Sequence, residues 1–337
     1  MYIDINKEIA DFFRRCHKNM QDSSINNYLD AYVNKYNEEE MKRALYKAGA
    51  AECKGKNAPS LFLSVDEWNN TPYHRTISLE KISDGPFSFT KEMTAGNYLF
   101  NADVIQKDPN RELKDWMRLR AMDRDFEAIY LYQDDKDWMM DAPSEAFTND
   151  PYAAKAHGNV ITFGLGIGYF LFMASHNKAV THLTVVERSQ AVIDMFKKNI
   201  LPQFDTNTPI TFICADAFSL WRKDFLSEFD YIYADIWQSG EDGLECITRF
   251  LSQYEPDFQT ADFWIEDSCF EVMWTLSLLH FEELATGHKT KVADHFTPYM
   301  NKIRSYYSTI DDTVSDVDTL KHLMYDTETI RHILHIH

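Results

Sequence analysis

Three glycines stand at alternate positions in the stretch "NVITFGLGIGYF" (residues 159–170), at Gly164, Gly166 and Gly168. One short apolar run precedes them and another follows. Residues 164–168, called the glycine loop below, therefore join a strand-like segment to a helix-like one. Glycine admits left-handed backbone and lets a ligand approach the main chain closely, so a loop of this kind is typical of nucleotide binding.

A carboxylate ends each of the next three strand-like segments, at Glu187, Asp216 and Asp235. Glu187 lies 19 residues beyond Gly168, a spacing that suits a carboxylate accepting both hydroxyls of a ribose. The alternative for Glu187 is a role in capping the next helix, which Ser189 could also fill. Ligands of parallel sheets lie beyond the carboxyl ends of the strands, so these acids are candidate binding residues.

The glycine pattern also bears on the kind of nucleotide. The dinucleotide fingerprint G-x-G-x-x-G would place its third glycine at position 169, which is Tyr169 here. A bulky residue at that position crowds the approach of a pyrophosphate to the helix N-terminus. The sequence therefore favours a nucleoside ligand without phosphates over a nicotinamide dinucleotide.

Strand-like and helix-like segments alternate from residue 159 onward. The strand-like segments are nearly continuous apolar runs, as expected for strands buried on both faces of a parallel sheet. They read "NVITF", "HLTVVE", "ITFICAD" and "FDYIYAD". Four successive strand–helix units predict an α/β domain with a Rossmann-like, doubly wound and mostly parallel sheet. The stretch "FWIED" (263–267) is the expected fifth strand, and helices are expected after it.

The first half of the chain has a different pattern. Residues 1–58 are expected to be helical, with one apolar stripe formed by Ile5, Ile9, Phe12, Cys16 and Met20 and a second helix over 26–49. Residues 59–150 are expected to form a small β-rich domain, with short strands over 60–65, 75–81, 87–93 and 97–105. A helix over 110–122 is expected to interrupt these strands, and a hairpin with its turn at 134–136 is expected to follow. A boundary near Pro151 would begin the third unit, 151–337.

The motifs "ITFGLGIGYF", "LTVVERS", "ICADAFS" and "FDYIYADIW", in this order and spacing, resemble the class I S-adenosylmethionine-dependent methyltransferases, and within them the spermidine synthase branch. The resemblance covers residues 159–251. It implies S-adenosylmethionine as the cofactor, with the glycine loop beneath its methionine moiety and Glu187 on its ribose. It further implies that Asp216 and the Ala217 amide hold the adenine and that Asp235 faces the reacting end. Leu165 and Arg188, in the same two loops, complete the implied cofactor-binding set.

Departures from the family pattern bear on the reaction. Many methyltransferases place an acid two residues before the first glycine, where this chain has Thr162. Spermidine synthases also lack that acid, so this departure favours the spermidine synthase branch. Aminopropyl transferases, however, carry two acids where this chain has Ile167 and Gln238. A polyamine site needs several carboxylates, so these departures favour methyl transfer to a small-molecule acceptor. A polyamine aminopropyltransferase and a non-catalytic, nucleoside-binding regulatory protein stay open as alternatives.

Two residues after the fourth strand-like segment are candidates for catalysis. Asp235 is the candidate general base. Trp237 could form an aromatic wall beside a sulfonium, a cation–π contact worth about 0.5–2 kcal/mol, or could simply pack beneath the neighbouring loop. The polar stretch at 239–243 is expected to be either a mobile loop that gates the site or a solvated turn.

Composition excludes several function classes. A formal net charge of −19 over 337 residues disfavours a nucleic-acid partner. The five cysteines are scattered without a CxxC pair, which argues against a metal site and suggests a reducing compartment. A signal peptide and a membrane span are both missing from the pattern, so we expect a cytoplasmic protein. The family resemblance implies a homodimer.

Overall fold

A computed structural model describes residues 1–80, 82–103 and 107–336. The described chain is a mixed α/β protein with a five-stranded sheet at its centre, and every strand pair in that sheet is parallel. Its strands are β9 (Gly158–Phe163), β10 (Val180–Glu187), β11 (Ile210–Cys214), β12 (Tyr231–Ala234) and β13 (Ala261–Phe263). This parallel sheet agrees with the sequence prediction and is compatible with a Rossmann-like fold.

The strand order in the sheet is β11-β10-β9-β12-β13. The chain therefore moves from β9 to one side, through β10 and β11, and then returns to the other side of β9 to form β12 and β13. Such a reversal of strand order is where parallel α/β sheets place their ligands. Helices follow the strands in turn: α6 (Tyr169–Ser175), α7 (Gln190–Asn199), α8 (Ala217–Leu220), α9 (Lys223–Leu226), α10 (Gly240–Gln253) and α11 (Glu266–Thr286).

Two sequence expectations near the end of this sheet are wrong. The fifth strand ends at Phe263 and not at 267, because Ile265 adopts a left-handed backbone (φ 48°) and Glu266 already begins α11. The stretch at 239–243 is not a mobile loop but the start of α10. Ser239 and Asp242 there form a capping box, which satisfies backbone N–H groups that a helix start leaves unpaired.

Two further sheets belong to the first half of the chain. The antiparallel sheet has the order β3-β4-β7-β8, with β3 (Ser83–Asp84), β4 (Phe87–Thr94), β7 (Phe126–Gln133) and β8 (Lys136–Asp141). The smaller sheet has the order β2-β6-β5, with β2 (Phe62–Leu63), β6 (Leu119–Met122) and β5 (Phe100–Asn101). The predicted hairpin is confirmed as β7–β8, and its turn residues Asp134 and Asp135 both have positive φ (51° and 59°).

The helix expected over 110–122 is wrong. A short 3₁₀ turn, η3 (Pro109–Arg111), is followed by left-handed backbone at Glu112 and Leu113, which ends any helix, and β6 then pairs with β2 and β5. The strand expected over 97–105 is reduced to β5, and its residues 104–105 lie outside the described chain. The strand expected over 75–81 is likewise replaced by α4 (Pro72–Thr76) and by irregular backbone at 77–80; residue 81 is outside the described chain.

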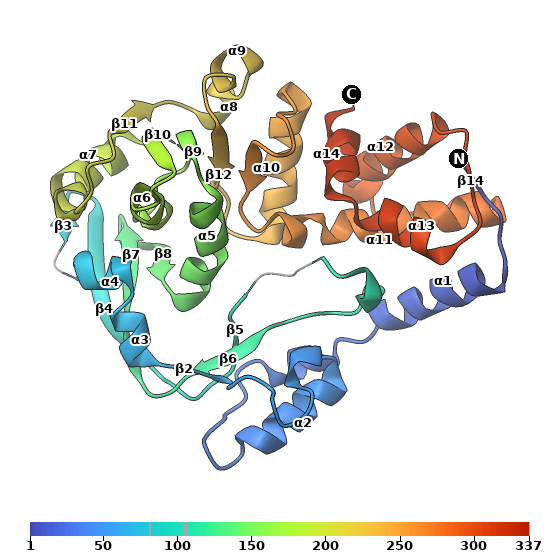
Figure 1. Ribbon diagram of the computed structural model, residues 1–337, viewed down its shortest axis with the longest axis horizontal. Coiled ribbons are helices and arrows are strands. Elements are labelled where there is room, and N and C mark those ends of the chain that lie inside the picture. Colours follow the sequence, from blue (N-terminus) through green and yellow to red (C-terminus); the bar gives the residue numbers. More distant parts are fainter. Residues whose placement is uncertain (81, 104–106, 337) are drawn as a thin grey trace.

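The helical residues of the first 58 divide between two hydrophobic clusters. Helix α1 (Lys7–Met20) buries Ile9, Phe12 and Cys16 of the predicted stripe and joins the large cluster with the C-terminal helices. Met20 is only half-buried, and Ile5, which precedes the helix, is exposed. Helix α2 (Glu38–Ala48), preceded by η1 (Ser24–Tyr28), joins a small cluster with β2 and β6 and lies far from the parallel sheet (Figure 1). The limits at 58 and 150 remain predictions.

The remaining elements complete the frame. They are α3 (Val65–Asn69), α5 (Pro143–Lys155), α12 (Thr297–Ser308), α13 (Val317–Tyr325) and α14 (Thr327–His335), with the short 3₁₀ turns η2 (Ala51–Cys53), η4 (Leu201–Gln203) and η5 (Asp294–Phe296). Pro151 lies inside α5, which packs on α6. Strand β1 (Tyr2–Ile3) pairs with β14 (Thr313–Val314), so both ends of the chain lie among the C-terminal helices (Figure 1).

Among the helices of the described residues, none combines the length and the apolar composition that a membrane span requires. Nowhere in the described chain do three or more His, Cys, Asp or Glu side chains gather in a way that could hold a metal ion.

Candidate functional site

The glycine loop connects the carboxyl end of β9 to α6. All three glycines have positive φ, 101° at Gly164, 51° at Gly166 and 75° at Gly168. The Gly164 N–H donates to the carbonyl of Val186 on β10 (2.9 Å), and the Gly168 N–H donates to the carbonyl of Leu165 (2.8 Å). The loop is thus a tight, left-handed turn tied to the neighbouring strand, which explains why glycine occupies these positions.

Two of the glycines also permit close packing inside the protein. A Cβ on Gly164 would lie 2.0 Å from the carbonyl oxygen of Asp235, at the end of β12. A Cβ on Gly168 would lie 2.4 Å from Cε2 of Phe196, on α7. Neither distance is compatible with a side chain, so these glycines are required by the contacts of the loop with β12 and α7.

Gly166 differs, because a Cβ there would make no contact closer than an ordinary van der Waals distance. The nearest atoms to a Cβ there would be Sδ and Cε of Met139 on β8, both at 3.5 Å. A methionine side chain is flexible and can move away from the loop. Gly166 and Met139 therefore mark the face of the glycine loop on which a ligand could lie.

Glu187 lies at the end of β10, next to the glycine loop, and is half-buried. Its Oε1 accepts the Ser189 N–H (2.8 Å), and the carboxylate also accepts backbone N–H groups of Leu165 and Arg188. Burial raises the pKa of Glu187 above its ordinary value, although these hydrogen bonds lower it in part. The side chain of Ser189 caps α7 by accepting the N–H of Val192, so the capping role belongs to Ser189 and not to Glu187.

Asp216 and Ala217 follow β11. In the sheet, β10 lies between β11 and β9, the strand that precedes the glycine loop. Asp216 is exposed, and its Oδ1 accepts the Phe218 N–H (2.8 Å) as the N-cap of α8. This bond occupies one of its two carboxylate oxygens. Ala217 is buried in the first turn of the same helix. Arg188 is exposed, whereas Leu165 is buried, so only Arg188 presents its side chain to solvent.

Asp235 follows β12, and a second carboxylate that sequence reasoning missed, Glu145, lies close enough for its charge to act on Asp235. Its N–H donates to the carbonyl of Phe163 (2.9 Å), and its side chain is half-buried. Burial raises the pKa of Asp235 well above its ordinary value, and the nearby charge of Glu145 on α5 raises it further. Burial and the charge of Asp141 raise the pKa of Glu145 in turn. Among the described residues, neither Asp235 nor Glu145 has an ion-pair partner.

Residues from the first half of the chain close this side of the glycine loop. The Tyr73 hydroxyl, on α4, donates to the carbonyl of Ile167 (2.8 Å). Nε2 of His74 lies 2.9 and 3.0 Å from the two carboxylate oxygens of Asp141. The Tyr169 hydroxyl donates to Oδ1 of Asp150 (2.8 Å). Apart from Tyr169, which follows the glycine loop directly, none of these residues stands in a motif, and only their position in the folded chain brings them to the loop.

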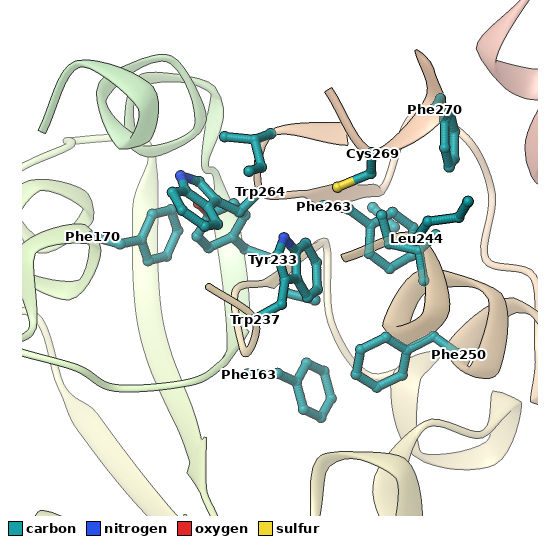
Figure 2. Packing of buried hydrophobic residues seen from close by; sticks show 14 of the residues in the cluster. Phe163, Phe170, Tyr233, Trp237, Leu244, Phe250, Phe263, Trp264, Cys269 and Phe270 are labelled. Carbon is teal, nitrogen blue, oxygen red and sulfur yellow. The ribbon is translucent and has the colours of Figure 1, made fainter. Parts of the chain in front are cut away.

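Trp237 lies in the apolar core and not on an open wall. Its side chain is 6% exposed, and its ring centroid lies 6.4 Å from that of Phe263 (Figure 2). A Cβ on Gly243 would lie 2.8 Å from its Nε1, which has no hydrogen-bond partner among the described residues. The geometry supports the packing interpretation of Trp237 and does not support a cation–π contact with a ligand.

Comparison with known proteins adds little to this geometry. No family model matches the chain, and no curated protein matches it. One solved structure with detectable similarity is the crystal structure of M. jannaschii TYW2 in complex with AdoMet, at 18% sequence identity and a TM-score of 0.27. The match covers 36% of this chain and 54% of that chain. A similarity this low does not bear on activity, which rests on the residues of the site itself.

Proposed function

We propose that this protein is an S-adenosylmethionine-dependent transferase, a methyltransferase acting on a small amine-bearing acceptor, with the doubly wound class I fold and a spermidine synthase-like site. One observation carries the proposal. The glycine loop, Glu187, Asp216 and Asp235 stand at the carboxyl ends of four neighbouring parallel strands, on both sides of the position where the strand order reverses.

The residues of the site fit an adenosyl cofactor. Gly166 offers a backbone face without a side chain, covered only by the flexible Met139. A carboxylate has about four acceptor positions, so Glu187 can accept a ribose hydroxyl in addition to its backbone N–H groups. Asp216 and the Ala217 amide would hold the adenine edge. The cofactor would supply an activated sulfonium, whose methyl group needs only a well-placed nucleophile.

The carboxylates of Asp235 and Glu145 support an amine as the acceptor. Two half-buried carboxylates without a counter-ion are costly for the folded protein, and a positively charged group bound beside them would offset that cost. An ammonium group is the simplest such partner. As the amine is positioned, Asp235 would take one of its protons and leave a neutral nitrogen as the nucleophile.

The same carboxylates favour a second candidate, aminopropyl transfer to a polyamine. Against it, Ile167 is buried where aminopropyl transferases carry an acid, and its carbonyl is occupied by Tyr73. Gln238, at the position of the second missing acid, is exposed and uncharged. Methyl transfer needs neither of these acids, and it is therefore our first choice.

Calorimetry tests the proposal with four probes: S-adenosylmethionine, S-adenosylhomocysteine, decarboxylated S-adenosylmethionine and NAD. We expect the first two to bind and NAD not to bind. Binding of none of the three adenosyl compounds would contradict the proposal. Much tighter binding of the decarboxylated compound would favour aminopropyl transfer. Binding without turnover over a panel of primary amines would favour a regulatory, nucleoside-binding protein.

Glu187→Ala provides the sharpest variant. Loss of a hydrogen bond to a charged group costs about 1.5–3 kcal/mol, so we expect affinity for S-adenosylhomocysteine to fall about 10- to 100-fold. Glu187→Gln keeps the size and one acceptor oxygen, and it should lose less. Glu245→Ala, on the exposed face of α10, is the matched control and should bind like the wild type. Equal affinities of all three variants would refute the ribose role of Glu187.

A further inference from the structure

The glycine loop is anchored at its centre by a residue that belongs to neither the parallel sheet nor its helices. Tyr73 of α4 is completely buried, and its hydroxyl donates to the carbonyl of Ile167 at 2.8 Å. Ile167 stands between Gly166 and Gly168. We propose that Tyr73 is a positioning residue, which fixes the ligand-binding conformation of the glycine loop from the first half of the chain. The inference rests on the proposed function.

The loop needs such an anchor because its glycines give it many alternative conformations. The Gly164 N–H bond to Val186 holds the start of the loop, and the Gly168 N–H bond to Leu165 holds its end. The bond from Tyr73 holds the other side of the peptide between Ile167 and Gly168, at its carbonyl oxygen. Without it the carbonyl of Ile167 would be buried and unpaired, and the Gly168 N–H bond alone would fix the orientation of that peptide. Ile167 directly follows Gly166, where the ligand is expected to lie.

Tyr73 is itself rigidly held, so that it can impose a conformation on the loop. Its ring packs against Tyr169 and Phe172 on α6, with centroids 5.0 and 5.4 Å away. The next residue, His74, is fixed on both sides: Nδ1 lies 2.6 Å from the Thr71 hydroxyl, and Nε2 is bonded to Asp141. Burial raises the pKa of Tyr73 well above its ordinary value, so its hydroxyl stays a proton donor throughout the neutral and mildly alkaline range.

This arrangement connects two parts of the site that are far apart in sequence. Asp141 is the last residue of β8, two positions after Met139, and its charge acts on Glu145, on the expected acceptor side. Helix α4 thus contacts the acceptor side through His74 and the cofactor side through Tyr73. Displacement of α4 would disturb the glycine loop even though no residue of α4 belongs to the expected cofactor-binding set.

The test uses Tyr73→Phe, which removes only the hydroxyl and keeps the ring packing. Tyr307→Phe is the matched control, because Tyr307 is also completely buried and its hydroxyl donates to a backbone carbonyl, that of Leu323, at 3.0 Å. Both variants should lower the unfolding midpoint by similar amounts. Only Tyr73→Phe should increase amide hydrogen exchange at residues 164–168, measured on the full chain without any ligand.

The second measurement is the affinity for S-adenosylhomocysteine. Loss of one buried hydrogen bond that holds the loop should weaken binding about 5- to 10-fold in Tyr73→Phe and leave Tyr307→Phe unchanged. If Tyr73→Phe does not fold, Thr71→Val, which frees the N-terminus of α4 and keeps the Tyr73 hydroxyl, should produce a smaller increase of the same kind.

The outcomes separate this inference from the proposed function. If the wild type binds no adenosyl probe while Tyr73→Phe loosens residues 164–168, the proposed function fails and the anchoring of the loop is supported. If the wild type binds and Tyr73→Phe binds equally well, the positioning role is overturned. Unchanged exchange at residues 164–168 overturns it as well, whatever the affinity.

Discussion

Gly168→Ala is the substitution whose cost follows most directly from the structure. Gly168 has φ +75°, and a Cβ there would lie 2.4 and 2.7 Å from Cε2 and Cζ of Phe196. The left-handed backbone costs an L-residue about 1–2 kcal/mol, and overpacking costs a further ~1–3 kcal/mol. Phe196 is completely buried and packs between Phe204 and Phe212, so its ring has little room to move. We expect Gly168→Ala to lower the free energy of unfolding by about 2–5 kcal/mol.

Equilibrium urea unfolding measures this loss, and two further variants separate its two causes. Phe196→Leu shortens the clashing side chain, so the double variant should recover about 1–3 kcal/mol relative to the sum of the single losses. Gly166→Ala carries the same left-handed backbone cost (φ +51°) but meets only Met139 at 3.5 Å. It should therefore lose only about 1–2 kcal/mol, while placing a methyl group on the face where the ligand is expected.

Two results would refute this reasoning. One is an equal loss of stability in Gly166→Ala and Gly168→Ala. The other is strict additivity of Gly168→Ala and Phe196→Leu, since it would mean that the alanine methyl group does not meet the ring. The slope of the unfolding free energy against urea concentration should be the same in all variants. A change in that slope would indicate a different unfolded or native state.

Other predictions concern buried charges. The pKa of Asp235 is higher in the folded state than in the unfolded state. At pH values between these two pKa values the folded state binds more protons, so the free energy of unfolding falls as the pH rises through this range. Asp235→Asn should therefore become progressively more stable than the wild type from about pH 4 to pH 7 in urea unfolding; a difference that does not vary with pH would contradict this. Glu266→Gln neutralises the partner of Arg331, which is 2% exposed and bonded to Glu266 at 2.6 and 2.7 Å. It should destabilise the protein by about 3–5 kcal/mol, and a loss below about 1 kcal/mol would show that the pair contributes little.

Much of the site could be predicted because it depends on a general property of parallel sheets. The glycine loop, Glu187, Asp216 and Asp235 each follow a strand, and the carboxyl ends of parallel strands share one edge. That these residues lie close together could therefore be predicted without knowing the structure of the rest of the chain. What the pattern could not reveal is which glycines are required by packing inside the protein. Gly164 and Gly168 are required by packing against Asp235 and Phe196, and only the folded chain shows these contacts.

The residues that complete the site come from the first half of the chain, where no spacing pointed to them. Met139 and Tyr73 reach the glycine loop, and Glu145 comes within charge range of Asp235, only because β8, α4 and α5 are brought to this side of the sheet by the fold. The helix expected over 110–122 failed for a related reason: its residues pair with β2 and β5, and pairing with distant strands overrode the local preference. The same applies to Trp237, whose position in the core depends on its contacts with Phe263 and Gly243.

The sequence by itself determined the parallel sheet, the left-handed loop and the row of acids, because apolar runs and glycine spacing are local properties that report how each segment is buried. Tertiary structure alone decided the role of each of these features. It placed Glu145 within charge range of Asp235, and the Tyr73 hydroxyl on the carbonyl of Ile167. Such contacts join residues separated by tens of positions in the chain, and their energies depend on distance and burial in the folded protein, which no periodicity in the sequence records.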